Sequence, residues 1–299
     1  IDARLFPNST DGESAAADYI DLTPTGFKLK DNGGAENGNG NTMTYIAIRR
    51  PDGYVGKPPE AGTDAFAMDT GNNSSNIPTF DSGFPVDFAL YRQPATIQNW
   101  MAPARLIQGK AVETNTTSAA STESGTMFDS NVGWANNSNF NTNYQSWMWK
   151  RGAGFDVVTY TGNASAGGIF QSIPHSLGKT PEMIWIKNRT EVRDWTVGHM
   201  GLDGGNAPWQ HYAVLNSATD ENGSLSSGVN VFWGNGAPNA THFNVGDWNT
   251  VNENNKAFVA FLFASVDGIS KCGYYDGSGS DITITTGFQP RFVLIKAYT

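Results

Sequence analysis

The sequence predicts an all-β protein made of tandem antiparallel β-sandwich or jelly-roll-like repeat units of about 90–115 residues. Three observations predict this fold class. Short runs of alternating apolar residues are separated by turn-forming residues, the same patterns recur in the same order, and charged residues make up only 16% of the chain while glycine contributes 34 residues. Glycine and asparagine tolerate the positive φ angles of tight turns, so this composition suits short strands joined by many turns.

The segment 155–267 shows the strand pattern most clearly. Its short, regularly spaced strands, with no run of 11 or more residues at a helical period, favour an antiparallel sandwich or jelly roll. The last run, "KAFVAFLFASV", is apolar on both faces and is predicted to lie centrally in its sheet, covered on both sides. The expected strands are 155–162, 167–173, 181–188, 194–199, 210–216, 230–234, 241–246 and 256–266.

Several ordered sets of motifs indicate an internal repeat. In the first set, large apolar residues alternate before a terminal glycine: "YIAIRRPDG" (45–53), "SWMWKRGAG" (146–154) and "AFLFASVDG" (260–268). These glycines lie 101 and 114 residues apart. Motifs that recur at such intervals are the sequence signature of a tandem-repeat architecture.

Further sets follow in the same order. A strand runs into a hairpin-type turn in "FAMDTGNNSS" (66–75), "VVTYTGNASA" (157–166) and "KCGYYDGSGS" (271–280). A glycine, a strand-opening proline and alternating apolar residues ending on a cation form "SGFPVDFALYR" (82–92), "LGKTPEMIWIK" (177–187) and "TGFQPRFVLIK" (286–296). Between these sets, Asn99-Trp100 matches Asp194-Trp195, and "TNTTSA" (114–119) matches "LNSATD" (215–220).

The motif sets divide the chain into four parts. Residues 1–62 are predicted to end in the last strands of a preceding repeat, 63–154 to form repeat one, 155–267 to form repeat two, and 268–299 to start a third, incomplete repeat. Within the first part, the Gly- and Asn-rich stretch 31–41 is expected to be a surface loop or a linker. The chain begins at Ile1 without a signal-peptide pattern, so we expect a piece of a longer polypeptide, with N-terminal processing as the alternative.

Composition argues against several partners. The net charge of −9 and pI near 4.8 would repel a phosphate backbone, so we expect no nucleic-acid partner. The longest apolar run has ten residues, about half of what a membrane-spanning helix needs, so we expect no membrane partner. Cys272 is the single cysteine, which excludes an intrachain disulfide and a cysteine-based zinc site.

No motif predicts catalysis, a cofactor or a metal. "LGKT" at 177–180 resembles the end of a phosphate-binding loop but lacks its first glycine and is followed by a proline. "ATDENG" at 218–223 resembles part of a calcium loop but has alanine in place of the first ligand, which favours a turn. The four histidines show no zinc-ligand spacing, and no acid–base pair stands out. We therefore expect a protein that is not an enzyme and has no cofactor, although a calcium ion at an inter-strand loop stays open.

Four of the nine tryptophans lie in Gly-, Asn- and Pro-rich loops: Trp134, Trp209, Trp233 and Trp248. An exposed indole next to Asn or Asp can stack on a pyranose ring while the amides bond the hydroxyl groups, so these four are the candidate glycan-binding residues. The alternative is that each ring folds back into the protein or packs against a neighbouring subunit.

The ordered motifs from "YTGNASAGGIF" through "LGKTPEMIWIK" to "TGFQPRFVLIK" resemble a repeat domain of virion proteins of marine tailed bacteriophages. The earlier "YIAIRRPDGYVGKPPEAGTDAFAMDTGN" is similar to cyanophage-type examples, and the resemblance covers about residues 42–299. It implies a structural or adhesive component of tail fibres or related appendages, located on the virion outside the cell. It supplies no catalytic residue and no ligand.

The leading hypothesis is therefore a non-enzymatic segment of a phage tail fibre or related appendage. Its expected partners are other copies of the same chain, with a trimer as the guessed state, and other virion proteins. The alternatives are a module for host attachment that binds a surface polysaccharide and a glycan depolymerase. Binding to host cells would identify the first alternative, and release of reducing sugar from host polysaccharide the second.

Overall fold

The computed structural model describes residues 20–23, 26–29, 62–152, 154–164, 170–223, 225–226, 229–234, 236–276 and 283–296. The chain divides into two compact units, 1–57 and 58–299. In the first unit, β1 (Ile20–Thr23) pairs antiparallel with β2 (Gly26–Leu29). The predicted strand 45–53 and loop 31–41 lie outside the described residues.

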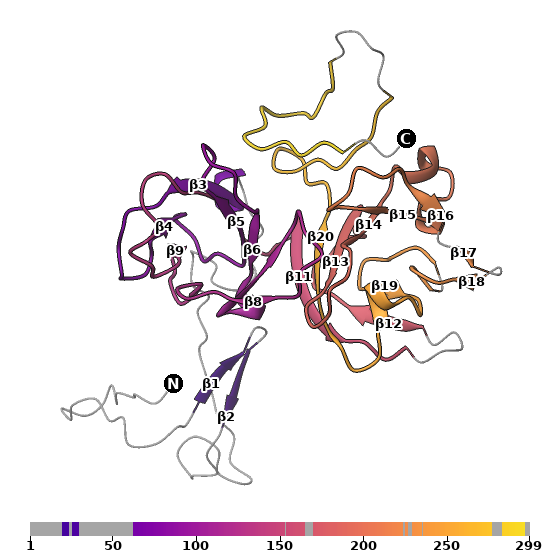
Figure 1. Ribbon diagram of the computed structural model, residues 1–299, viewed down its shortest axis with the longest axis horizontal. Helices are drawn as coiled ribbons and strands as arrows, with labels where there is room; N and C mark the ends of the chain where they lie inside the picture. Colours follow the sequence, from indigo (N-terminus) through magenta and orange to yellow (C-terminus); the bar gives the residue numbers. More distant parts are fainter. Residues whose placement is uncertain are drawn as a thin grey trace, which may run out of the picture. The chain divides into compact units, whose positions relative to one another are not determined.

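The second unit is an all-β structure with antiparallel sheets, which confirms the predicted fold class (Figure 1). Sheet one has the strand order β3-β10-β5-β6-β7-β8. Its strands are β3 (Phe66–Thr70), β5 (Phe88–Arg92), β6 (Met101–Pro103), β7 (Lys110–Glu113), β8 (Ser121–Thr122) and β10 (Gln145–Trp149).

Sheet two has the strand order β11-β20-β13-β14-β15-β16. Its strands are β11 (Phe155–Thr161), β13 (Met183–Asn188), β14 (Thr196–His199), β15 (His211–Val214), β16 (Asn222–Gly223) and β20 (Ala257–Phe263). Three two-stranded ladders accompany the large sheets: β4 (Phe80–Asp81) with β9 (Gly133–Trp134), β12 (Gln171–Pro174) with β19 (His242–Val245), and β17 (Leu225–Ser226) with β18 (Val229–Asn230).

Helical structure in the described residues is limited to single turns. The four 3₁₀ turns are η1 (Gly62–Asp64), η2 (Arg105–Ile107), η3 (Leu202–Gly205) and η4 (Pro208–Gln210), and the α-helical turn is α2 (Asn249–Asn252). Within this described part, no helix has the length and apolar character needed to cross a membrane.

Sheets one and two have the same topology. In each sheet, the strand that comes last in the sequence lies between the first and the second strands of that sheet. The remaining three strands extend from the second strand as a meander. The ladders β4–β9 and β12–β19 also come from corresponding places in the chain. All strands of sheet one lie within 63–154, and all strands of sheet two lie within 155–267.

The correspondence extends to individual hydrogen bonds. The Asn115 side chain accepts a bond from the Trp100 N–H at 2.8 Å, and the Asn216 side chain accepts one from the Trp195 N–H at 2.9 Å. Each of these asparagines follows its strand by the same interval and fixes the turn before β6 or β14. The matched sequence motifs therefore occupy equivalent structural positions.

Two glycines show why the Thr-Gly-Asn turns recur. A Cβ atom at Gly71 would collide with the Phe140 carbonyl oxygen, and one at Gly162 with the Glu253 carbonyl oxygen. Both glycines directly follow the first strand of their sheet, where the backbone of the segment before the last strand passes closely. Only glycine fits this approach.

Most strands expected in repeat two are present with slightly different bounds, and β20 lies centrally between β11 and β13 as predicted. The expected strand 167–173 corresponds to β12, and its first three residues lie outside the described residues. The expected strand 230–234 is wrong over most of its length, because Val231 to Gly234 form a turn. Gly234 has φ of 54°, and the bulky residues of this stretch point into the core from a turn rather than from a ladder.

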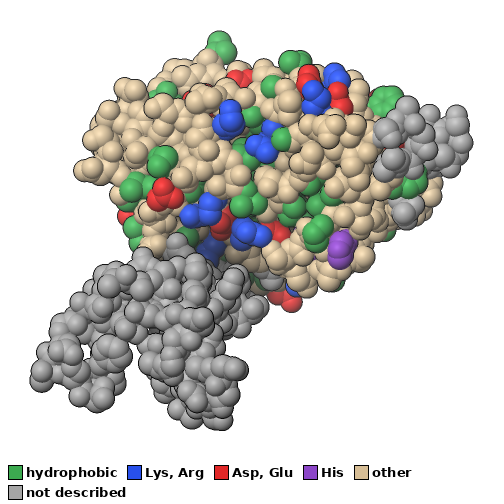
Figure 2. All heavy atoms as spheres, turned by 90° about the horizontal axis from the view of Figure 1, so that it is seen from below, with side chains coloured by type: hydrophobic (Ala, Val, Ile, Leu, Met, Phe, Trp, Pro, Cys, Tyr) green, Lys and Arg blue, Asp and Glu red, His purple; other side chains and the backbone are tan. Residues whose placement is uncertain are grey.

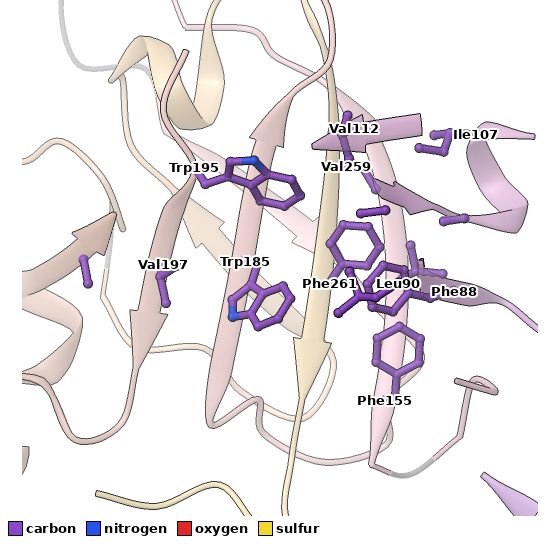
Figure 3. Close-up of a cluster of buried hydrophobic side chains, with 14 of the residues drawn as sticks. Phe88, Leu90, Ile107, Val112, Phe155, Trp185, Trp195, Val197, Val259 and Phe261 are labelled. Atoms are coloured by element: carbon purple, nitrogen blue, oxygen red, sulfur yellow. The ribbon is translucent and has the colours of Figure 1, made fainter. Parts of the chain in front are cut away.

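The two large sheets pack face to face. Phe88 and Leu90 project from sheet one toward Phe155, Trp185 and Phe261 of sheet two (Figure 3). Equivalent faces meet here, since Leu90 of β5 and Trp185 of β13 hold matching positions in their sheets. The buried inter-sheet core consists of Phe88, Leu90, Ala102, Ala104, Ile107, Val112, Phe155, Val157, Trp185, Trp195, Val197, Leu202, Ala213, Val259 and Phe261.

Each sheet also buries its other face. The ladder β4–β9 covers the outer side of sheet one, and β12–β19 covers the outer side of sheet two (Figure 1). Along β20, Val259 and Phe261 face sheet one, whereas Phe258, Ala260 and Leu262 face the outer core of repeat two. This arrangement explains why the strand is apolar on both faces.

Candidate functional site

Trp134, the candidate in repeat one, is a core residue. Its ring stacks between Phe80 and Phe128 at centroid distances of 5.4 and 5.2 Å, and its Nε1–H donates to the Ser146 hydroxyl at 3.0 Å. Its exposed fraction is 0%. The expectation of an exposed indole at this position is wrong, because the loop folds back over the outer face of sheet one.

Trp233, a candidate in repeat two, is buried in the same way, with an exposed fraction of 1%. Its Nε1–H donates to the His211 carbonyl oxygen at 2.7 Å. The ring packs over Gly198 of β14, where a Cβ atom would lie 2.6 Å from it. The expectation of an exposed ring is therefore wrong here as well, since the indole fills the space that Gly198 leaves open.

Trp209 and Trp248 lie nearer the surface. Trp209 of η4 is partly buried and meets Trp233 edge to face at 5.3 Å. Trp248 has an exposed fraction of 45% and packs one side on Phe232 at 5.6 Å. Of the four candidates, Trp248 is the one with a ring available to a sugar, and Trp134 belongs to a different repeat from the other three.

A cluster of polar residues borders this aromatic group at the β15–β16 end of sheet two. Asp203 comes from η3, His211 opens β15, and Glu221 directly precedes β16. One ligand atom from each side chain lies within 4.8 Å of the other two, so together they could hold a metal ion. Sequence reasoning missed the set because its members come from three separate elements and follow no ligand spacing.

A second group of polar contacts joins the two repeats. The Trp195 Nε1–H donates to the Glu113 carbonyl oxygen at 2.7 Å, and the Lys187 ammonium donates to the Thr117 carbonyl oxygen at 3.3 Å. Lys187 is fully buried, and this burial lowers its pKa from 10.5 to about 8, with Asp194 opposing the shift. Repeat two thus binds the segment that follows β7 in repeat one.

Cys272 is not a candidate nucleophile. Burial, with a smaller contribution from Glu182, raises the pKa of its thiol to about 12. Because the thiolate is the reactive form, this cysteine stays protonated and inert near neutral pH.

The scan against protein-family models matches residues 66–299 to a domain of unknown function, DUF7483. The match begins at the first residue of β3 and covers both large sheets. The searches of curated proteins and of solved structures found no match. Since the family model covers most of its length, the chain belongs to the DUF7483 family.

Proposed function

We propose that this chain is a non-enzymatic structural segment of a bacteriophage tail fibre or related appendage, built from tandem β-repeats. The observation that carries the structural role is the core between sheets one and two. Each large sheet is apolar on both faces, so neither repeat can bury its inner face without a neighbour. Units that need neighbours in this way are the building blocks of extended arrays.

A similar contact between a lysine and a backbone carbonyl occurs one repeat further along the chain. The Lys187 ammonium reaches the Thr117 carbonyl oxygen after β7, and the Lys296 ammonium reaches the Ser217 carbonyl oxygen after β15 at 2.6 Å. Lys187 and Lys296 end the same sequence motif. The tail thus contacts the segment after β15, as repeat two contacts the segment after β7, with the acceptor shifted by one residue. This similarity supports a repeated mode of assembly.

The surface also suits a particle component outside the cell. Figure 2 shows a face on which uncharged polar side chains and backbone predominate and charged side chains are few. The resemblance of the repeat motifs to virion repeats supports the phage assignment. Mass spectrometry of purified phage particles and labelling with an antibody against this chain would test it. Detection on appendages is expected, and detection in infected cells but not on particles would refute the proposal.

We also propose that the chain forms a homo-oligomer, with a trimer as the expected state. Large apolar side chains are exposed together near the end of the described chain, at Val293, Leu294 and Ile295. Exposed apolar groups of this kind mark association surfaces. Light scattering at micromolar concentration should give three times the chain mass of 32.2 kDa, and a stable monomer would contradict the oligomer.

A second candidate function, a module that binds host surface polysaccharide, is favoured by the exposed ring of Trp248. Binding to a glycan array that is lost on Trp248→Ala, but kept on Trp100→Ala at a partly buried position, would support it. If the unmodified chain does not bind host polysaccharide, the glycan-binding function is refuted and the structural role is the remaining proposal.

A further inference from the structure

We propose that Asp203, His211 and Glu221 bind one divalent transition-metal ion, with Zn²⁺ as the best fit. The site lies at the β15–β16 end of sheet two, where the chain between β14 and β15 folds back through η3 and η4. Its ligands would be the Nδ1 atom of His211 and one carboxylate oxygen from each acidic residue.

The distance between His211 and Glu221 suits two ligands of one ion better than a direct hydrogen bond. The Nδ1 atom of His211 lies 3.6 Å from Glu221 Oε1, which is beyond the usual hydrogen-bond range. Tetrahedral zinc with ligand distances of about 2.1 Å separates its ligands by about 3.4 Å. The two side chains are therefore spaced like neighbouring ligands of a common ion.

The imidazole nitrogen lacks a hydrogen-bond partner. Among the described side chains, His211 Nδ1 and Gln171 Oε1 are the two buried polar atoms without one. An unsatisfied buried polar atom costs about 1–3 kcal/mol, so such atoms in proteins call for an explanation. A metal ion between His211 and the carboxylates would bind this lone pair.

The three side chains are held in place by contacts from other elements. Both Glu221 carboxylate oxygens accept from the Asp203 N–H, at 2.9 and 3.1 Å, and Asp203 Oδ2 accepts from the Ala207 N–H at 3.1 Å. Trp233 binds the His211 carbonyl oxygen from the core side. Asp203 has φ of 53°, a left-handed conformation that is uncommon for non-glycine residues but that aspartate adopts more readily than most. Such support fixes ligands before an ion arrives.

The donor types select the class of ion. An imidazole nitrogen with two carboxylates suits Zn²⁺ and related transition ions, whereas Ca²⁺ takes oxygen ligands. The strand pairing places Lys110 and Ala120 of repeat one at the positions of His211 and Glu221. Repeat one therefore offers no second site of this kind, and one ion per chain is expected.

The test is calorimetric titration of the untagged full chain, treated with chelator, with Zn²⁺, Mn²⁺ and Ca²⁺. We expect one Zn²⁺ per chain, weaker Mn²⁺ and still weaker Ca²⁺. Glu221→Gln and His211→Gln should each weaken Zn²⁺ binding by about tenfold or more, because a neutral amide binds Zn²⁺ far more weakly than a carboxylate or an imidazole does. The matched control is His242→Gln, which alters a partly buried histidine that lies outside the Asp203, His211 and Glu221 group and is bonded to Thr241.

Circular dichroism and thermal unfolding of each variant without metal separate loss of a ligand from loss of the fold. Glu221→Gln keeps the size of the side chain and an oxygen that can accept from the Asp203 N–H, so its fold should match the parent. Absence of a one-to-one Zn²⁺ site in the parent would overturn the proposal. Unchanged Zn²⁺ affinity in a folded Glu221→Gln or His211→Gln variant, or tighter binding of Ca²⁺ than of Zn²⁺, would do the same.

Discussion

Repeat one and repeat two share a topology but use equivalent residues differently. In repeat one, the Arg92 guanidinium lies over the Trp100 ring at 5.0 Å, so these two residues interact with each other within repeat one. In repeat two, the matching Lys187 and Trp195 each bond to a backbone carbonyl of repeat one. The conserved part of the unit is the sheet, and the variable part is the set of residues that reach the neighbour.

The second difference lies in the loops. Six residues connect β6 to β7 in repeat one, whereas eleven connect β14 to β15 in repeat two. The longer connection carries Asp203 and Trp209, which have no counterpart in repeat one. A site can therefore be added to one repeat without changing the shared sheet, since connections at a sheet edge tolerate insertions.

The largest effect is expected in the shared core. Phe261→Ala should lower the free energy of unfolding by about 3–5 kcal/mol, because it opens a cavity between the two sheets. Denaturant unfolding measures this loss. Val192→Ala, at a side chain with an exposed fraction of 64%, is the control and should change little. A loss below about 1 kcal/mol for Phe261→Ala would argue against a tightly packed interface.

The buried lysine gives the next effect, which depends on pH. Because the folded state lowers the pKa of Lys187 from 10.5 to about 8, the unfolded chain binds more protons between these values. Stability contributed by this group should rise with pH through that window, by up to about 3 kcal/mol. Subtracting the pH profile of Lys187→Met isolates the effect. A difference profile that stays flat or falls between pH 8 and 10.5 would contradict it.

A matched pair of tryptophan variants would sharpen the comparison of polar contacts. Trp195→Phe removes the donor to the Glu113 carbonyl and should cost about 1–2 kcal/mol. Trp100→Phe, at the equivalent position of repeat one, should cost less because this ring is partly exposed. Equal losses of unfolding free energy in urea would show that the hydrogen bond between Trp195 and Glu113 adds no measurable stability.

The smallest effect is expected at the surface of repeat two. Trp248→Ala should cost about 1 kcal/mol or less, since its ring is 45% exposed and packs only one side on Phe232. Trp134→Ala in repeat one, in contrast, should cost about 3–5 kcal/mol. Thermal unfolding of the two variants checks this contrast. A severe loss for Trp248→Ala would mean that the ring is a structural residue as well.

Sequence patterns predicted most strands of sheets one and two because alternation and turn residues act locally. The strands expected in the last motif copies are wrong for the part that the structure describes, since 271–276 and 283–296 contain no strand. They also paired equivalent strands, since Asn115 and Asn216 keep the same role in both repeats. They failed for the burial of Trp134 and Trp233, because a loop rich in small residues can fold back over a sheet as easily as it can project from it. The composition of a loop does not distinguish these two outcomes.

Two features depend on tertiary structure alone. The packing of equivalent sheet faces cannot be read from alternation, which shows that β20 has two apolar faces but not what covers them. The group of Asp203, His211 and Glu221 forms because η3 folds back onto the β15–β16 pair. Asp203, His211 and Glu221 lie in or beside three separate elements, so the sequence around each of them gives no signal of a shared site.

The most direct test of the central claim, that the two repeats share one core, is native-state hydrogen exchange on a Phe88→Ala variant. Phe88 belongs to repeat one and meets Phe261 of repeat two at 4.4 Å. The shared core predicts that amide protection falls together in β10 and in β20, because both central strands depend on the same packing. Loss of protection in β10 with unchanged protection in β20 would contradict it, since the repeats would then be independent.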